Sequence, residues 1–146
     1  MRQDEQNTKL QGKALLERIV QLAREKKGVN LVALDVSKLV YYTNYFLILS
    51  GRTDLHVKGI AKHVEKELAA ADIHAITVEG QDFHRWVLMD YGEVMVQLFL
   101  EPLRDLYELE KLWADAPIIE LGEEEKGFDE DEFESDESDD LFADFD

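Results

Sequence analysis

The pattern of apolar and polar positions predicts two long helices in the first half of the chain. The first helix begins near residue 8 or 11 and runs to residue 27, where Gly28 is a natural stop. Its apolar stripe consists of Leu15, Ile19, Leu22 and Ala23. The second helix covers residues 54–71, and either Thr53 or Asp54 can cap its N-terminus. Its apolar face consists of Val57, Ile60, Ala61, Val64 and Leu68.

Short runs of β-branched and aliphatic residues predict five strands. They cover residues 30–36, 45–50, 75–79, 85–90 and 94–100. A tight turn over residues 91–93 joins the last two strands into a hairpin. A third helix begins at Pro102 and ends before Pro117. The predicted order is α-β-β-α-β-β-β-α, an α/β fold class with helices packed on a mixed sheet.

Acidic residues are concentrated at the C-terminal end of the chain. The sequence has 33 acids against 16 bases, a net charge of −17, and residues 122–146 alone hold 14 acids and one lysine. Residues 1–121 therefore carry 19 acids and 15 bases, which is nearly balanced. We predict a globular domain over residues 1–121 and an acidic, disordered tail over residues 122–146. The apolar side chains of the tail, which could dock on a basic partner, are Phe128, Phe133, Leu141, Phe142 and Phe145.

The composition narrows the classes of function. The chain has no cysteine, which excludes disulfides, zinc–thiolate sites and cysteine nucleophiles. No segment supplies the Lys/Arg cluster that phosphate neutralisation needs, so sequence-specific binding of nucleic acid is not expected. Neither a secretory signal, a transit peptide nor a membrane-spanning segment is recognisable. We therefore expect a cytoplasmic protein without membrane contact.

Known catalytic motifs give no match. A P-loop, a dinucleotide-binding glycine motif, a nucleophile elbow and a zinc-protease motif are all missing from the sequence. Ser50-Gly51, between a strand and a helix, is similar to the start of a nucleotidyltransferase site. Such a site also needs paired carboxylates that hold two metal ions, whereas Asp90 and Glu93 are separated by the hairpin turn. We predict no catalytic residue and no cofactor.

The histidines show no metal-ligand spacing. His56 and His63 are seven residues apart in the second helix, about 10.5 Å along its axis, so one ion cannot bind both. A structural role is the better interpretation for this pair. His74 and His84 flank the third strand without a carboxylate–histidine pattern. No metal site is therefore predicted.

Trp86 is the most distinctive candidate for a binding residue. The strand that contains it is apolar on both faces, with Trp86 and Leu88 on one side and Val87 and Met89 on the other. One face is expected to be covered by a helix, and the other is either covered as well or offered to a partner. Exposed aromatic side chains are frequent hot spots of protein interfaces.

Several ordered blocks of residues resemble the signature of one protein family. In the hairpin region they are Glu79-Gly80, Trp86, Leu88, Asp90, Gly92, Glu93, Val94 and Val96. The other blocks are residues 33–36, 43–46, 50–51, 104–113 and 115–117. Together they extend from about Gly12 to Leu121 and are similar to the ribosomal silencing factor family (RsfS, also called YbeB or Iojap).

This resemblance implies a fold, a partner and a mechanism. The fold would be nucleotidyltransferase-like without the catalytic carboxylates, and the protein would not be an enzyme. It would bind the large ribosomal subunit through its ribosomal protein fourteen and sterically block joining of the small subunit, as a translation repressor. Alternatives are an assembly factor of the large subunit using the same surface, a homodimer that buries this surface, and a metal-dependent nucleotidyltransferase. The expected partner-binding residues are Trp86, Asp90, Tyr91, Glu93, Phe99, Arg104 and Tyr107.

Three positions depart from the family pattern. Asn44 stands where members commonly have aspartate before the second strand. Gln97 stands where the last strand usually has a histidine, so any role of that histidine is lost. Glu93 replaces the more usual aspartate, which is a mild change.

Overall fold

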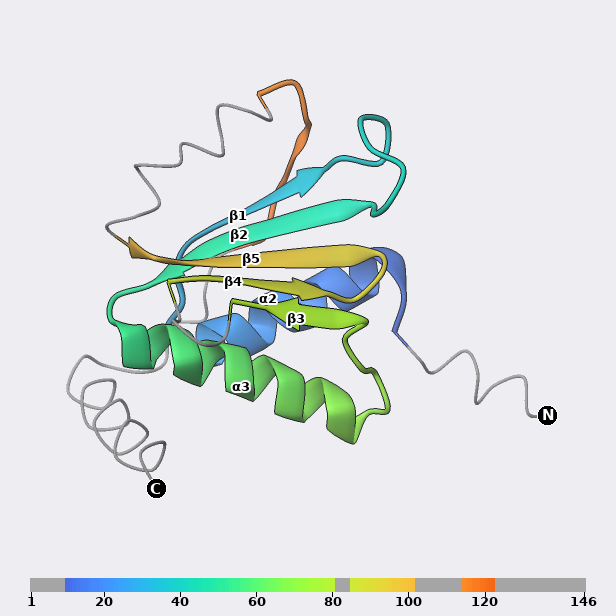
Figure 1. Cartoon of the computed structure of the whole chain (residues 1–146). Coiled ribbons are helices and arrows are strands. Elements are labelled where there is room, and N and C mark those ends of the chain that lie inside the picture. The colour runs from blue at the N-terminus through green and yellow to red at the C-terminus, as the bar shows by residue number, and fades with distance from the viewer. Residues whose placement is uncertain (1–9, 81–84, 102–113, 123–146) are drawn as a thin grey trace.

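The computed structural model describes residues 10–80, 85–101 and 114–122 (Figure 1). Its elements are α2 (Gly12–Glu25), β1 (Val29–Asp35), β2 (Tyr45–Gly51), α3 (Asp54–Ala70), β3 (Thr77–Glu79), β4 (Trp86–Asp90), β5 (Val94–Leu100) and β6 (Ile118–Ile119). The two helices and five strands predicted within these residues are confirmed, with ends shifted by two residues or fewer except at the start of the first helix. The third predicted helix, which would begin at Pro102, lies outside the described residues. The short strand β6 was not predicted.

The strands form a mixed sheet in the order β3-β4-β5-β2-β1-β6. β5 runs parallel to β2, with Val96 opposite Leu47. The other four described pairings are antiparallel, including the predicted β4–β5 hairpin. Figure 1 shows both helices against the same face of this sheet. The α/β fold class predicted from the sequence is therefore confirmed.

The end of α2 differs in detail from the prediction. Lys27, not Gly28, adopts the left-handed conformation that ends the helix, with φ of 63°. The N–H groups of Lys27 and Gly28 donate to the carbonyls of Arg24 and Ala23, each at 2.9 Å, as in a Schellman motif. Gly28 serves a different purpose, because a Cβ there would lie 2.9 Å from Cδ1 of Leu49. The glycine lets the chain pass close to β2.

α3 begins with a side-chain cap, as predicted. Thr53 Oγ1 accepts the N–H of His56 at 3.0 Å. The buried His56 ring makes two further bonds: Nδ1 accepts the N–H of Arg52 at 2.9 Å, and Nε2 lies 2.7 Å from the carbonyl oxygen of Lys26. Because a carbonyl only accepts, Nε2 carries the proton. His56 therefore joins the start of α3 to the end of α2, which confirms its structural role.

Two other histidines contact carboxylates. His63 Nε2 lies 2.8 Å from Oε1 of Glu25, which adds a second link between α3 and α2. His74 Nε2 lies 3.1 Å from Oδ1 of Asp72. This contact joins two residues of the loop after α3, and the sequence pattern did not indicate it.

The core lies on both faces of the sheet. The face covered by α2 and α3 carries the main cluster, to which β2 contributes Leu47 and Leu49, β4 contributes Val87 and Met89, and β5 contributes Val94, Val96 and Leu98. The opposite face, called the second face below, carries a smaller cluster of Leu34, Val36, Phe46, Ile48, Phe99 and Ala116. Strand alternation separates the two sets. The second face is the one that presents Trp86.

Candidate partner-binding site

Trp86 lies on the second face of the sheet, at the start of β4. Its indole stacks on the ring of Phe99 in β5, with centroids 4.9 Å apart and an interplanar angle of 27°. Trp86 is 37% exposed, whereas Phe99 is fully buried. Val87 and Met89, which point to the opposite face of β4, are buried in the main core. β4 is therefore apolar on both faces, as predicted, and the indole is held on a rigid base.

The neighbours of Trp86 follow from the register of the hairpin. Trp86 pairs with Phe99, and Leu88 pairs with Gln97. Asp90 lies on the same face at the far end of β4. We call these five residues the Trp86 patch. Gln97, one of the three departures from the family pattern, is only 6% exposed and lies within this patch rather than at its rim.

Gly80 sets the approach of the chain to Trp86. A Cβ at Gly80 would lie 2.0 Å from the carbonyl oxygen of Trp86, and the residue has φ of 88°. Only glycine meets both conditions. On the other side of β4, the N–H of Leu100 donates to the carbonyl of Arg85 at 2.8 Å. In the sequence, Gly80 was noted only as part of a block that resembles the family signature. Its role in letting the chain approach the backbone of Trp86 was not predicted.

Asp90 connects the patch to the hairpin turn. Its Oδ1 accepts the N–H of Gly92 at 2.8 Å, and Gly92 has φ of 87°. The turn is closed by the N–H of Tyr91, which donates to the carbonyl of Val94 at 2.9 Å. The half-buried Asp90 carboxylate thus stabilises the turn and places negative charge at the end of the patch.

Two predicted residues lie away from the patch. Tyr91 is 8% exposed and belongs to the main core. Burial, and secondarily the charge of Glu65, raises the pKa of its phenol. The Glu93 carboxylate accepts the N–H of Gly12, the first residue of α2. Because the N-cap residue Gln11 makes no capping bond, Glu93 supplies the acceptor and negative charge that a helix N-terminus favours.

The structure therefore divides the seven predicted residues into three groups. It brings Trp86, Phe99 and Asp90 together on the second face. It places Tyr91 in the main core and the Glu93 carboxylate against the start of α2. The last two, Arg104 and Tyr107, lie outside the described residues. The contact role of all seven stays a prediction.

The described residues of the patch carry few chemically distinctive groups. The patch offers an exposed indole on a rigid aromatic base, next to a carboxylate. Within residues 10–80, 85–101 and 114–122, no three acidic or histidine side chains are grouped closely enough to hold a metal ion. In the same part of the chain, no helix combines the length and apolar character needed to cross a membrane. The described residues form a mixed α/β domain that presents a partly exposed indole at the start of β4.

Comparison with known proteins identifies the family. A family model described as ribosomal silencing factor during starvation matches residues 9–142. The chain is 36% identical over 109 residues to the ribosomal silencing factor RsfS of Bacillus subtilis (strain 168), covering 75% of this chain and 92% of that protein. A crystal structure of a Bacillus halodurans protein has a TM-score of 0.68 and 34% identity, covering 75% of this chain and all of that one. The chain belongs to the ribosomal silencing factor family, as the resemblance predicted.

A more distant relative carries a different name. The chain is 30% identical over 102 residues to the mitochondrial assembly of ribosomal large subunit protein 1 of Mus musculus. The match covers 68% of this chain and 45% of the mouse protein. The relatives of this chain thus include proteins named for silencing and a protein named for assembly.

Proposed function

We propose that this protein represses translation by binding the large ribosomal subunit through its ribosomal protein fourteen and sterically blocking joining of the small subunit. It would act in the cytoplasm, without enzymatic activity and without a cofactor. The observation that carries the proposal is the exposed indole of Trp86, stacked on buried Phe99 in a member of the ribosomal silencing factor family. In this proposal residues 1–121 form the binding domain.

The rigidity of Trp86 favours it as the anchor. A side chain that is already held in place loses little conformational entropy on binding, and the stacked Phe99 ring holds the indole before a partner arrives. A protein of this size can bury a standard interface of about 800 Å² per partner. Such an area suffices to occlude a docking surface without any chemistry.

The acidic residues have separate roles in the proposal. Asp90 supplies charge complementary to a basic ribosomal protein, which increases the association rate. Glu93 and Tyr91 belong to the hairpin turn next to Asp90. In this proposal they contribute indirectly, by stabilising that turn. Arg104 and Tyr107 complete the proposed contact as contact or packing residues.

The test is co-sedimentation of the full chain with purified large and small subunits, followed by a subunit-joining assay. We expect wild type to sediment with the large subunit alone and to block joining. Trp86→Ala should bind at least about tenfold more weakly, since it removes a hot-spot side chain. Tyr41→Ala is the matched control, because Tyr41 is 97% exposed and lies outside the patch. Wild-type binding by the Trp86 variant would refute the proposed anchor.

A second candidate function is assembly of the large subunit through the same surface. The name of the mouse relative favours it. Both functions predict co-sedimentation with free large subunits, so the joining assay decides between them. Binding that leaves joining intact would support assembly.

A homodimer through the Trp86 patch is the remaining alternative. It predicts that Trp86→Glu lowers the mass measured by light scattering from dimer to monomer. A variant that becomes monomeric yet still binds the large subunit would show that the indole serves the dimer and not the ribosome.

A further inference from the structure

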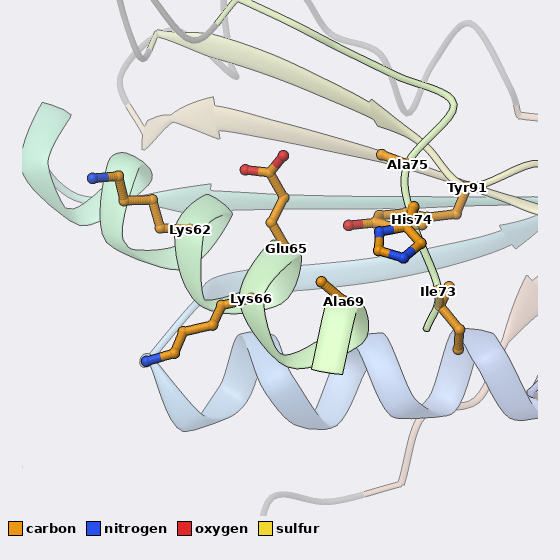
Figure 2. Close-up of a pocket in the computed structure, with 8 residues that line it drawn as sticks. All are labelled: Lys62, Glu65, Lys66, Ala69, Ile73, His74, Ala75 and Tyr91. Atoms are coloured by element: carbon orange, nitrogen blue, oxygen red, sulfur yellow. The ribbon is translucent and has the colours of Figure 1, made fainter. Parts of the chain in front are cut away.

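A cavity of about 410 Å³ lies at the C-terminal half of α3, on the side of the sheet opposite the Trp86 patch. Its lining includes the apolar side chains of Ala69 and Ile73 and the ring of Tyr91. Figure 2 shows Lys62 and Lys66 on successive turns of α3. The pocket therefore combines an apolar interior with a cationic border.

Several lining groups have no partner within the part of the chain that the structure describes. The exposed Lys62 and Lys66 form no ion pair there, and the Tyr91 hydroxyl makes no hydrogen bond there. Glu65 contributes one negative charge to the lining. The pocket suits a ligand that has an apolar ring, adjacent negative charges that can reach the lysines of α3, and an acceptor for the phenol.

The acidic tail of the same chain has this chemistry and starts nearby. Gly122 is held at the end of α2, because Arg24 Nη2 donates to its carbonyl at 2.9 Å. The next residue of α2, Glu25, contacts His63 on α3 at 2.8 Å. In the sequence of α3, His63 lies between Lys62 and Lys66, the two lysines of the pocket. The tail therefore leaves the described domain beside the helix that carries the pocket.

Length and sequence single out one aromatic residue of the tail. Phe133 is 11 residues beyond Gly122, a span of about 36 Å when extended, and has Glu132 and Glu134 on either side. Phe128 is less suited, since Lys126 precedes it by two positions. Attachment to the domain gives the tail an effective concentration on the order of millimolar, so weak contacts are populated.

We propose that the acidic tail docks on its own domain, with Phe133 in the cavity and the adjacent glutamates against Lys62 and Lys66. The inference does not depend on the proposed function. The docked tail occupies the helix side of the sheet and leaves the Trp86 patch, on the second face, available. It also keeps the concentrated negative charge of the tail beside cationic side chains.

The test uses the full chain and its lack of cysteine. Ser135→Cys provides a single attachment point for a nitroxide spin label, two residues from Phe133. We expect the label to broaden the amide signals of Lys62, Lys66 and Ile73 in an isotope-labelled sample. The broadening should decrease at least about fivefold near 1 M salt, where the screening length falls to about 3 Å.

Matched variants decide whether the contact is the proposed one. Phe133→Ser should remove the broadening, whereas Phe142→Ser should leave it unchanged. Lys62→Glu combined with Lys66→Glu should also remove it, with the rest of the amide spectrum retained as the check on folding. An unchanged signal in Phe133→Ser would overturn the proposal, and so would loss of the signal in Phe142→Ser.

A mixed sample controls for contacts between molecules. In it, one set of chains carries the spin label but no isotope, and the other set carries the isotope but no spin label. Broadening that persists at comparable strength in this mixture would mean that the tail docks on a second copy, which contradicts the intramolecular site. Absence of broadening in every sample would equally reject the proposal.

Discussion

At the scale of single residues, three aromatic side chains predicted as anchors have three different environments. Trp86 is partly exposed, Phe99 is buried beneath it, and Tyr91 lies in the main core behind the turn. The alternation of β4 identified which residues share a face. It did not reveal which of these residues are covered by other segments, because burial on a given face depends on contacts that are distant in sequence.

Replacing the two stacked rings separates support from contact. Phe99→Ala should lower the free energy of unfolding by about 3–5 kcal/mol, because it leaves a cavity under the patch. Trp86→Ala should cost about 1–2 kcal/mol, since part of the indole is already in water. Urea unfolding of both variants measures the difference. A larger loss for Trp86→Ala than for Phe99→Ala would contradict the stacking order seen here.

The phenol of Tyr91 predicts a dependence of stability on pH. Its pKa is raised above the ordinary 10.0 by burial and by Glu65, so above pH 10 the unfolded chain ionises first. The contribution is fully present below the unfolded pKa and is lost as pH rises toward the folded pKa. Near pH 11, wild type should therefore have lost about 1 kcal/mol more stability than Tyr91→Phe, relative to pH 8. Tyr41→Phe, at a ring that is 97% exposed, serves as control and should behave as wild type in urea unfolding.

At the scale of elements, periodicity predicted most of the fold and missed what depends on distant partners. β2 and β5 were expected as strands. Their parallel pairing could not be predicted from either segment alone, because α3, β3 and β4 separate them in the sequence. β6 has two residues, and its strand character comes from pairing with Ala33 and Leu34 of β1, far away in sequence. For the same reason the contact of Glu93 with Gly12, 81 positions apart, could not be predicted. Local signals such as the Thr53 cap were predicted correctly.

Two glycines with similar backbone conformations distinguish strain from steric conflict. Gly80 and Gly92 have φ of 88° and 87°, but the nearest atom to an added Cβ is a carbonyl oxygen at 2.0 Å for Gly80 and a side-chain carbon at 3.7 Å for Gly92. Gly92→Ala should cost about 1–2 kcal/mol from the left-handed conformation alone. Gly80→Ala should cost at least about 2 kcal/mol more, because the backbone of Trp86 must move. Equal losses in urea unfolding would show that the close approach to Trp86 has no energetic weight.

At the scale of the whole molecule, the sheet separates the Trp86 patch from the pocket on the helix side. The Trp86 patch on the second face ends in the carboxylate of Asp90, whereas the pocket on the helix side is bordered by Lys62 and Lys66. If both proposals hold, a basic partner and the acidic tail would therefore bind at the same time without competing. In the two proposals made above, the ribosomal contact and the acidic tail would thus lie on different sides of one domain.

Asp90→Asn tests the electrostatic part of the ribosomal contact on the full chain. Asparagine keeps an oxygen that can accept the N–H of Gly92, a bond of 2.8 Å in wild type, so the hairpin turn is retained while the charge is lost. The association rate with the large subunit should fall about threefold at low salt, and the dissociation rate should stay nearly the same, because a rim charge acts mainly on encounter. The two association rates should converge as salt rises, since screening removes the attraction in wild type as well. Kinetics of binding to immobilised large subunits over a salt series measure this. A difference confined to dissociation would show that Asp90 is a buried contact of the complex and not a steering charge.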